Sequence, residues 1–116
     1  MYTKGLHILS TIHTKSDRHL TDVQVFKEKV NDFVTELSLT SVGAVFHDFE
    51  GGGFTAVVCL TESHLSIHTW PEYNRITLDV FLSNNSRNNE DRCRALHDRI
   101  IEQFEIEKIE TENILR

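Results

Sequence analysis

The sequence has little cysteine and little proline, with two cysteines and one proline among 116 residues. Two cysteines do not make a disulfide framework, so a reducing cytoplasm is the default environment. Neither cysteine has the spacing of a zinc ligand and the seven histidines are scattered, so we predict no metal site. One proline and no low-complexity stretch give no sign of a linker. We therefore expect a single domain over residues 1–116.

Positive charge and long apolar runs are also scarce. Twelve Lys and Arg residues face eighteen Asp and Glu residues, and the basic side chains form no cluster. Nucleic acids and anionic membranes are therefore poor candidate partners. No apolar run reaches membrane-spanning length, and the first residues lack the hydrophobic region of a signal peptide. These absences predict a cytoplasmic protein.

Apolar residues recur at helical spacing in two segments. Residues 22–37 carry one apolar stripe and predict an amphipathic helix, with Thr21 and Gln24 resembling a capping box at its start. A second helix is predicted over residues 90–104, with Asn89 as its N-cap residue.

The other apolar segments are short, and several alternate as strands with one buried face do. Pro71 ends one of these runs, because proline lacks the N–H that a central strand needs. Short turns between the runs favour antiparallel pairing, so we predict an α+β fold, a two-layer α/β sandwich of a mainly antiparallel sheet and two helices. The predicted strands are residues 6–13, 40–49, 54–61, 65–70 and 76–82, with an edge strand at 106–111.

Residues 61–72 bring together side chains that can do chemistry. Two histidines, two serines, two glutamates and a tryptophan occur within a dozen residues between two predicted strands. Functional residues concentrate on such connections, although composition alone names no reaction. The run from Glu62 to Glu72, ESHLSIHTWPE, closely resembles the processing-site signature of prokaryotic-type S-adenosylmethionine decarboxylases. The resemblance extends upstream through residues 46–49 and downstream through residues 78–81.

This resemblance implies a pyruvoyl-dependent proenzyme that cuts itself between Glu62 and Ser63, giving residues 1–62 and 63–116. The Ser63 hydroxyl would attack the Glu62 carbonyl carbon and convert the amide to an ester. β-Elimination would then leave a dehydroalanine that hydrolyses to a pyruvoyl group. The carbonyl of that group forms a Schiff base with a substrate amine and accepts the electrons left by departing carbon dioxide.

The resemblance also implies roles for two residues beside the cleavage point. His68 matches the residue that removes the Cα proton for elimination, a task that suits a pKa near neutral. Thr55 stands where the family usually has a serine whose hydroxyl supports the intermediate. Ser63 and His68 have opposite parity on a regular strand, so we expect a bend or bulge that brings them into contact.

Four further residues match substrate-binding positions of the family. Phe49 and Trp70 correspond to aromatic residues on the adenine side, Glu72 to a carboxylate that binds ribose, and Leu65 to a further contact. The resemblance thus implies a small-molecule substrate of the amino-acid type. Because 116 residues are few for an enzyme that must enclose its substrate, we expect a homodimer with a shared site.

Ser83 departs from the family pattern. Members usually carry a cysteine there, which protonates the substrate carbon after decarboxylation. A serine hydroxyl is a far weaker acid than a thiol, whose ordinary pKa is about 8.5. Cys59 precedes Ser63 by four residues, about 13 Å along an extended strand, and Cys93 falls on the predicted core face of a helix. Ser83, a water molecule or a histidine is then left to supply the proton.

Three functions remain open from the sequence. The first is an S-adenosylmethionine decarboxylase that makes the aminopropyl donor for spermidine in polyamine biosynthesis. The second is a pyruvoyl-dependent arginine or ornithine decarboxylase of the same descent, which the altered Ser83 would fit. The third is an inactive homologue that regulates an active subunit, although the intact Glu62, Ser63 and His68 argue against it.

Overall fold

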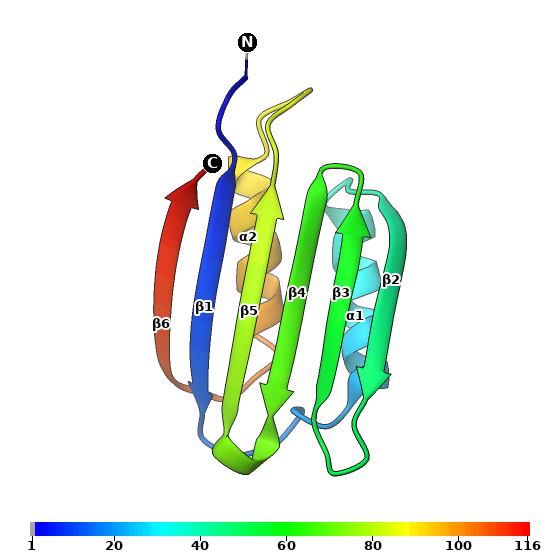
Figure 1. The fold of residues 1–116 in the computed structure, drawn as a ribbon, viewed down its shortest axis with the longest axis vertical. Helices are drawn as coiled ribbons and strands as arrows, with labels where there is room; N and C mark the ends of the chain where they lie inside the picture. Colours follow the sequence, from blue (N-terminus) through cyan, green and yellow to red (C-terminus); the bar gives the residue numbers. More distant parts are fainter. Residues whose placement is uncertain (1) are drawn as a thin grey trace.

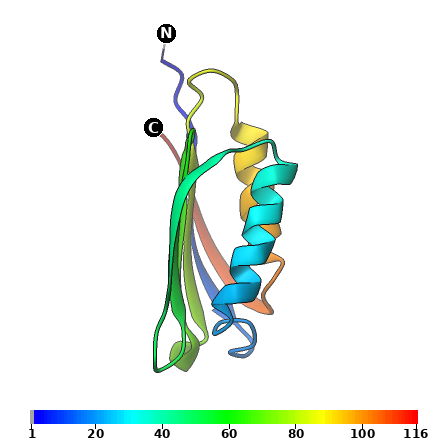
Figure 2. The same cartoon turned by 90° about the vertical axis from the view of Figure 1, so that its right-hand side faces the viewer.

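The chain folds into a six-stranded sheet with two helices packed on one face (Figure 1, Figure 2). The computed structural model describes residues 2–116, and Met1, the first residue of the expected domain, lies outside this range. The elements are β1 (Leu6–Thr14), α1 (Val23–Glu36), β2 (Ser41–Asp48), β3 (Phe54–Leu60), β4 (Ser63–Trp70), a 3-10 turn η1 (Pro71–Tyr73), β5 (Arg75–Leu82), α2 (Glu90–Ile101) and β6 (Ile106–Leu115).

The strand order is β2-β3-β4-β5-β1-β6, and every neighbouring pair is antiparallel. The predicted two-layer α+β sandwich is therefore confirmed. Strands β2 to β5 follow one another through short connections, whereas β1 lies between β5 and β6. No helix among residues 2–116 is both long and apolar enough to cross a membrane.

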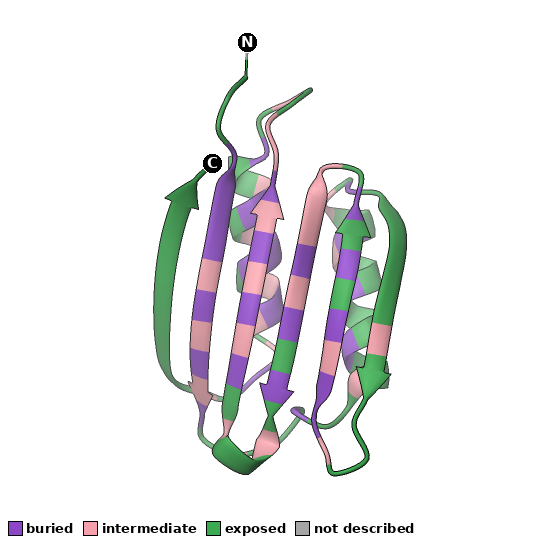
Figure 3. Cartoon of the chain, viewed as in Figure 1, coloured by how far each residue is buried: buried purple, intermediate pink, exposed green. Residues whose placement is uncertain are grey.

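The core lies between the sheet and the helices. Along β4 and β5 fully buried residues alternate with more exposed ones, which Figure 3 shows as purple bands on the central strands. Burying an aliphatic side chain stabilises the fold by about 1.5–3 kcal/mol, so this face holds the two layers together. The buried side chains include Leu65, Ile67, Leu78 and Val80 from the sheet and Phe26, Val30, Leu96 and Ile100 from the helices.

Both helix starts differ in detail from the predicted caps. The Asp22 carboxylate accepts a hydrogen bond from the Val25 N–H at 3.1 Å, so the cap of α1 is Asp22 and not the predicted pair Thr21 and Gln24. Asn89 occupies the N-cap position of α2, but its side chain does not cap that helix. Its amide instead donates a hydrogen bond to the carboxylate of Glu62, in the turn between β3 and β4.

Candidate active site

The predicted site residues fall into two groups at opposite ends of β4. Ser63 begins the strand, whereas His68 and Trp70 lie near its other end. β4 keeps an unbroken antiparallel register with β5 from Ser63 to Trp70, and with β3 from Ser63 to His68. Five residues in such a strand separate the Cα atoms of Ser63 and His68 by about 16 Å. The predicted bend that brings them into contact is therefore wrong, because pairing on both sides keeps β4 extended.

Ser63 has an unusual backbone conformation at the candidate cleavage point. Its φ of +131° lies in a region that residues with a side chain rarely adopt. Such a conformation costs of order 1–3 kcal/mol and persists only where surrounding contacts impose it. Here the two-residue turn Thr61–Glu62 joins β3 to β4, and Ser63 pairs with Leu60 on one side and Leu82 on the other.

The carbonyl group of Glu62 is held by Ser83. The Ser83 N–H donates to this oxygen at 2.8 Å, and the Ser83 hydroxyl donates to it at 3.2 Å. The position follows from the sheet register, since Leu82 pairs with Ser63 and the next residue therefore faces Glu62. Two donors on one carbonyl oxygen can stabilise negative charge that develops there.

The side chain of Glu62 is held by two residues that the sequence did not single out for the site. Arg87 donates from Nε and Nη2 to the two carboxylate oxygens at 3.0 and 2.7 Å, and the Asn89 amide donates to Oε2. The Arg87 hydrogen bonds lower the pKa of the Glu62 carboxyl, so it is ionised at neutral pH. The only sequence signal was the run of polar residues between Ser83 and α2.

A row of aromatic side chains lies next to the candidate cleavage point. His64, Phe81 and His7 pair across β4, β5 and β1, and the Phe81 ring centroid lies 5.4 Å from that of His7 and 6.1 Å from that of His64. Arg116 stacks over Phe81 at 5.3 Å. Burial lowers the pKa of His7, which favours its neutral form. Sequence reasoning gave His7 and His64 no role.

The other end of β4 borders a surface pocket of about 290 Å³. Phe49, His68, Trp70 and Glu72 line it, so four of the predicted residues come together there. Phe49 and Trp70 are 48% and 38% exposed, and the pocket is thus open to ligands. Leu65 is not among the lining residues, because it points into the core and is 0% exposed.

Thr55 and His68 contact each other directly. They are opposite residues of β3 and β4, and the Thr55 hydroxyl is hydrogen-bonded to His68 Nδ1. The Trp70 ring lies beside the imidazole, with 6.1 Å between ring centroids. Because Thr55 occupies Nδ1, proton exchange by this histidine would use Nε2.

A buried threonine and a glycine hold the turn that carries Phe49. The Thr69 hydroxyl donates to the Leu20 carbonyl at 2.6 Å and accepts from the Phe54 N–H at 2.8 Å. Gly53 has a φ of +85°, and a Cβ there would lie 2.8 Å from the Thr69 carbonyl oxygen. The turn therefore packs against the end of β4 at a distance that only glycine permits.

The two cysteines differ in their access to the site. Cys93 is fully buried, and burial raises the pKa of its thiol to about 11. Cys59 is exposed and pairs with His64, the neighbour of Ser63. The predicted separation of about 13 Å along an extended strand is wrong, because the chain reverses at residues 61–62 and returns Cys59 to the strand beside Ser63.

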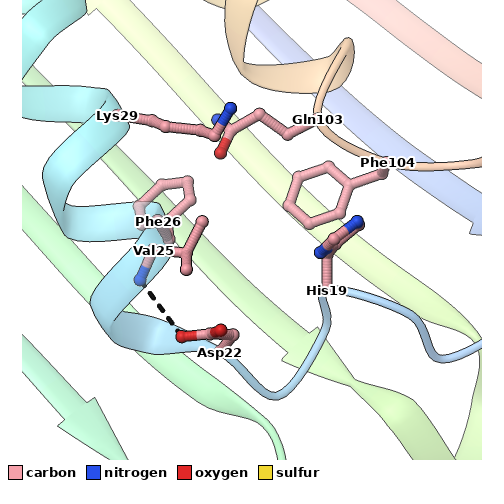
Figure 4. Close-up of a pocket in the computed structure, with 7 residues that line it drawn as sticks. All are labelled: His19, Asp22, Val25, Phe26, Lys29, Gln103 and Phe104. Carbon is pink, nitrogen blue, oxygen red and sulfur yellow. Dashed lines mark hydrogen bonds between the residues drawn. The ribbon is translucent and has the colours of Figure 1, made fainter.

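A second cavity lies on the helix side of the molecule, between the start of α1 and the segment after α2 (Figure 4). It measures about 70 Å³, enough for a few water molecules. Gln103 Nε2 is buried there without a hydrogen-bond partner among the described residues. None of the predicted site residues lines this cavity, which is too small for a nucleoside-sized ligand.

Comparison with known proteins assigns the chain to a family. A protein-family model described as S-adenosylmethionine decarboxylase matches residues 6–116. The chain belongs to the S-adenosylmethionine decarboxylase family. The family match includes residues 84–116, which lie beyond the segments that carry the sequence resemblance.

Relatives of the S-adenosylmethionine decarboxylase family agree with this assignment. S-adenosylmethionine decarboxylase proenzymes from Archaeoglobus fulgidus and Aquifex aeolicus are each 38% identical to the chain, over 77 and 79 residues. These segments cover 66% and 68% of this chain, and 69% and 58% of the two relatives. The crystal structure of the Aquifex aeolicus VF5 adenosylmethionine decarboxylase superposes with a TM-score of 0.85 at 30% identity, covering 100% of this chain and 92% of that one.

Proposed function

We propose that this chain is a self-processing S-adenosylmethionine decarboxylase that makes its own pyruvoyl group from Ser63. One observation carries the proposal: Ser63 has a strained backbone conformation, and the Glu62 carbonyl that precedes it accepts two hydrogen bonds from Ser83. Strain and a polarised carbonyl both favour attack by the neighbouring hydroxyl. Relatives named S-adenosylmethionine decarboxylase proenzyme support the same substrate for this chain.

The proposed cleavage starts with an acyl shift. The Ser63 hydroxyl oxygen bonds to the Glu62 carbonyl carbon, and the two Ser83 donors stabilise the negative charge on the carbonyl oxygen. The C–N bond then breaks, the amine of Ser63 takes up a proton, and an ester joins the two residues. Loss of the Ser63 Cα proton expels the Glu62 carboxylate with residues 1–62. Water replaces the nitrogen of the dehydroalanine, ammonia leaves, and residues 63–116 begin with the pyruvoyl group.

His68 of a second copy is the general base of this scheme. Within one chain His68 and Ser63 are about 16 Å apart, whereas proton transfer needs about 3 Å. A two-fold dimer solves the problem for both copies, since each His68 would reach the Ser63 of the other chain. Within residues 2–116 no helix covers the sheet face that carries His68, and this face exposes Val45, Val57 and Trp70, which offer apolar area for pairing (Figure 2).

The groups that surround position 63 are suited to hold a pyruvoyl group. Once Glu62 has left, the N–H and hydroxyl of Ser83 no longer have its carbonyl as an acceptor, and both donors lie beside position 63. The group, when formed, supplies a carbonyl that captures the substrate amine and takes up the electrons released with carbon dioxide. Ser83 can orient that end of the substrate by hydrogen bonds.

The pocket at the far end of β4 would bind the nucleoside part of the substrate. Phe49 and Trp70 offer aromatic faces for adenine, and the Glu72 carboxylate offers acceptors for the ribose hydroxyls. This pocket and Ser63 are separated along β4 just as His68 and Ser63 are. A substrate that reaches both groups therefore requires the pocket of one copy beside the Ser63 of the other.

Protonation of the substrate carbon is assigned to Ser83, which occupies the place of the usual family cysteine. The position of Cys59 makes this thiol the alternative donor, since it is exposed on the strand beside Ser63. The variant Cys59→Ser distinguishes them. If the thiol supplies the proton, this variant loses turnover while its cleavage continues, and if Ser83 does, turnover stays unchanged.

Mass measurement under denaturing conditions tests the proposal. Matured protein should give two pieces, residues 1–62 and 63–116, and the downstream piece should start with a carbonyl that reacts with phenylhydrazine. The Ser63→Ala variant should stay whole. The matured protein should release carbon dioxide from S-adenosylmethionine. An intact chain after prolonged incubation would contradict self-processing and favour an inactive homologue. Release from arginine or ornithine alone would contradict the proposed substrate.

A further inference from the structure

We propose that Arg87 and Asn89 are positioning residues for the self-cleavage step, which they promote by fixing the side chain of Glu62. This inference rests on the proposed cleavage between Glu62 and Ser63. The acyl shift itself consumes only the backbone carbonyl of Glu62 and the hydroxyl of Ser63. The carboxylate of Glu62 takes no part in these bonds, and yet it is the most heavily hydrogen-bonded side chain at the cleavage point.

Arg87 binds the carboxylate in a two-pronged arrangement. Nε donates to Oε2 at 3.0 Å and Nη2 donates to Oε1 at 2.7 Å, which fixes both the position and the plane of the carboxylate. Nη2 also donates to the Ser38 carbonyl at 2.7 Å, beyond the end of α1. The Glu62 side chain is 16% exposed and that of Arg87 34%, so the pair is partly shielded from water.

Asn89 ties the same carboxylate to the residue that holds the scissile carbonyl. Its amide donates to Glu62 Oε2 and, at 2.9 Å, to the backbone carbonyl of Ser83. Asn89 is 1% exposed and is anchored by its backbone, whose N–H donates to Asn84 Oδ1 at 2.7 Å. One buried amide therefore sets the distance between Glu62 and the Ser83 donors.

These contacts attach Glu62 at its carboxylate and at its carbonyl, immediately before the strained residue. A free turn would relax Ser63 to a negative φ and so change the position of the Glu62 carbonyl relative to the Ser63 hydroxyl. With both ends of Glu62 fixed, rotation about the bonds next to the Glu62–Ser63 peptide is restricted. Restricting the relative motion of reacting groups is a large source of rate enhancement, so weaker fixation of Glu62 should slow cleavage.

The rate of cleavage in variants of Arg87 tests this inference. Purified, uncleaved protein from a short expression is incubated, and the share of intact chain is followed by denaturing mass measurement. Arg87→Ala removes both charge-assisted hydrogen bonds and should slow cleavage about tenfold to a hundredfold. Arg87→Lys keeps the positive charge but cannot bind both carboxylate oxygens side by side, so its cleavage rate should lie between those of Arg87→Ala and wild type. Arg99→Met, which removes an exposed pair with Glu36, is the matched control and should cleave at the wild-type rate.

Chemical rescue separates positioning from a general loss of structure. Guanidinium ion at non-denaturing concentration should restore part of the rate of Arg87→Ala by occupying the vacated site, and should leave wild type and Arg99→Met unchanged. If Arg87→Ala does not fold, the rate of folded Arg87→Lys decides the question. If wild type cleaves and both Arg87→Lys and Arg87→Ala cleave at the same rate as wild type, the inference is overturned but the proposed function is not. A wild-type chain that never cleaves refutes the proposed function and the inference with it.

Discussion

Cleavage in trans is the sharpest prediction of the proposed function. In the proposed scheme, a Ser63→Ala chain has His68 but no nucleophile, and a His68→Ala chain has Ser63 but no base. Each should therefore stay intact when it is the only chain present. When the two variants are mixed and allowed to exchange subunits, a mixed dimer joins the Ser63 of one chain to the His68 of the other. The His68→Ala chain should then be cut, and the Ser63→Ala chain should never be.

The size of the effect follows from geometry and pairing statistics. A separation of about 16 Å along β4 leaves no route for direct proton transfer between Ser63 and His68 of one chain, so rescue in the mixture requires the His68 of the partner copy. Random pairing of equal amounts places about half of the His68→Ala chains in mixed dimers. About half of these chains should therefore be cut after one round of exchange, and more if exchange continues.

The assay is denaturing mass measurement, in which the two full-length variants differ in mass and only one can yield fragments. The matched control replaces Ser63→Ala by a chain that carries both substitutions, which supplies no base and should rescue nothing. Absence of cleavage in the mixture, with subunit exchange demonstrated separately, would refute the shared site. Cleavage of His68→Ala alone would point to a base other than His68, and His64 is adjacent to Ser63 in the chain.

Five further results are expected. Ser83→Ala should slow cleavage about a hundredfold in the mass assay, since one carbonyl donor is lost, whereas Ser83→Cys should raise turnover or lifetime in a carbon dioxide release assay. Trp70→Ala should raise the KM for S-adenosylmethionine about tenfold in steady-state kinetics, through loss of aromatic contact. Gly53→Ala should destabilise the fold by about 1–3 kcal/mol in urea unfolding, because it combines positive φ with a 2.8 Å clash. Arg87 lowers the pKa of Glu62 from an ordinary value near 4.5. In urea unfolding, the free energy of unfolding of wild type should therefore exceed that of Arg87→Met by its full amount above pH 4.5. This difference should disappear as the pH falls through the lowered pKa.

Sequence patterns predicted the fold well, because one face of the sheet and one stripe of each helix are buried. The alternation at residues 76–82 became β5, and the apolar stripe at residues 22–37 became α1. The edge strand predicted at residues 106–111 runs further, through Leu115, since pairing with β1 continues beyond the last apolar alternation. Helix caps were less predictable, because adjacent residues such as Thr21 and Asp22 can both act as caps.

The candidate site was harder to predict, because its contacts cross between elements. The motif identified Ser63 and His68, but only strand pairing shows that they lie apart. Distance along the sequence misplaced Cys59, which a hairpin returns to the strand beside Ser63. The contact of Arg87 with Glu62 depends on how the loop before α2 folds back over the β3–β4 turn, and no local pattern encodes that path.

The strand order has a consequence for the two pieces that the proposed cleavage would produce. Residues 1–62 supply β1, β2 and β3, and residues 63–116 supply β4, β5 and β6. In the sheet, β3 borders β4, while β1 is inserted between β5 and β6. The pieces are thus interlocked along three strand interfaces, and cutting one peptide bond frees neither. The nicked protein should travel as a single species in native chromatography, and each half produced alone should lack the neighbours it needs to fold.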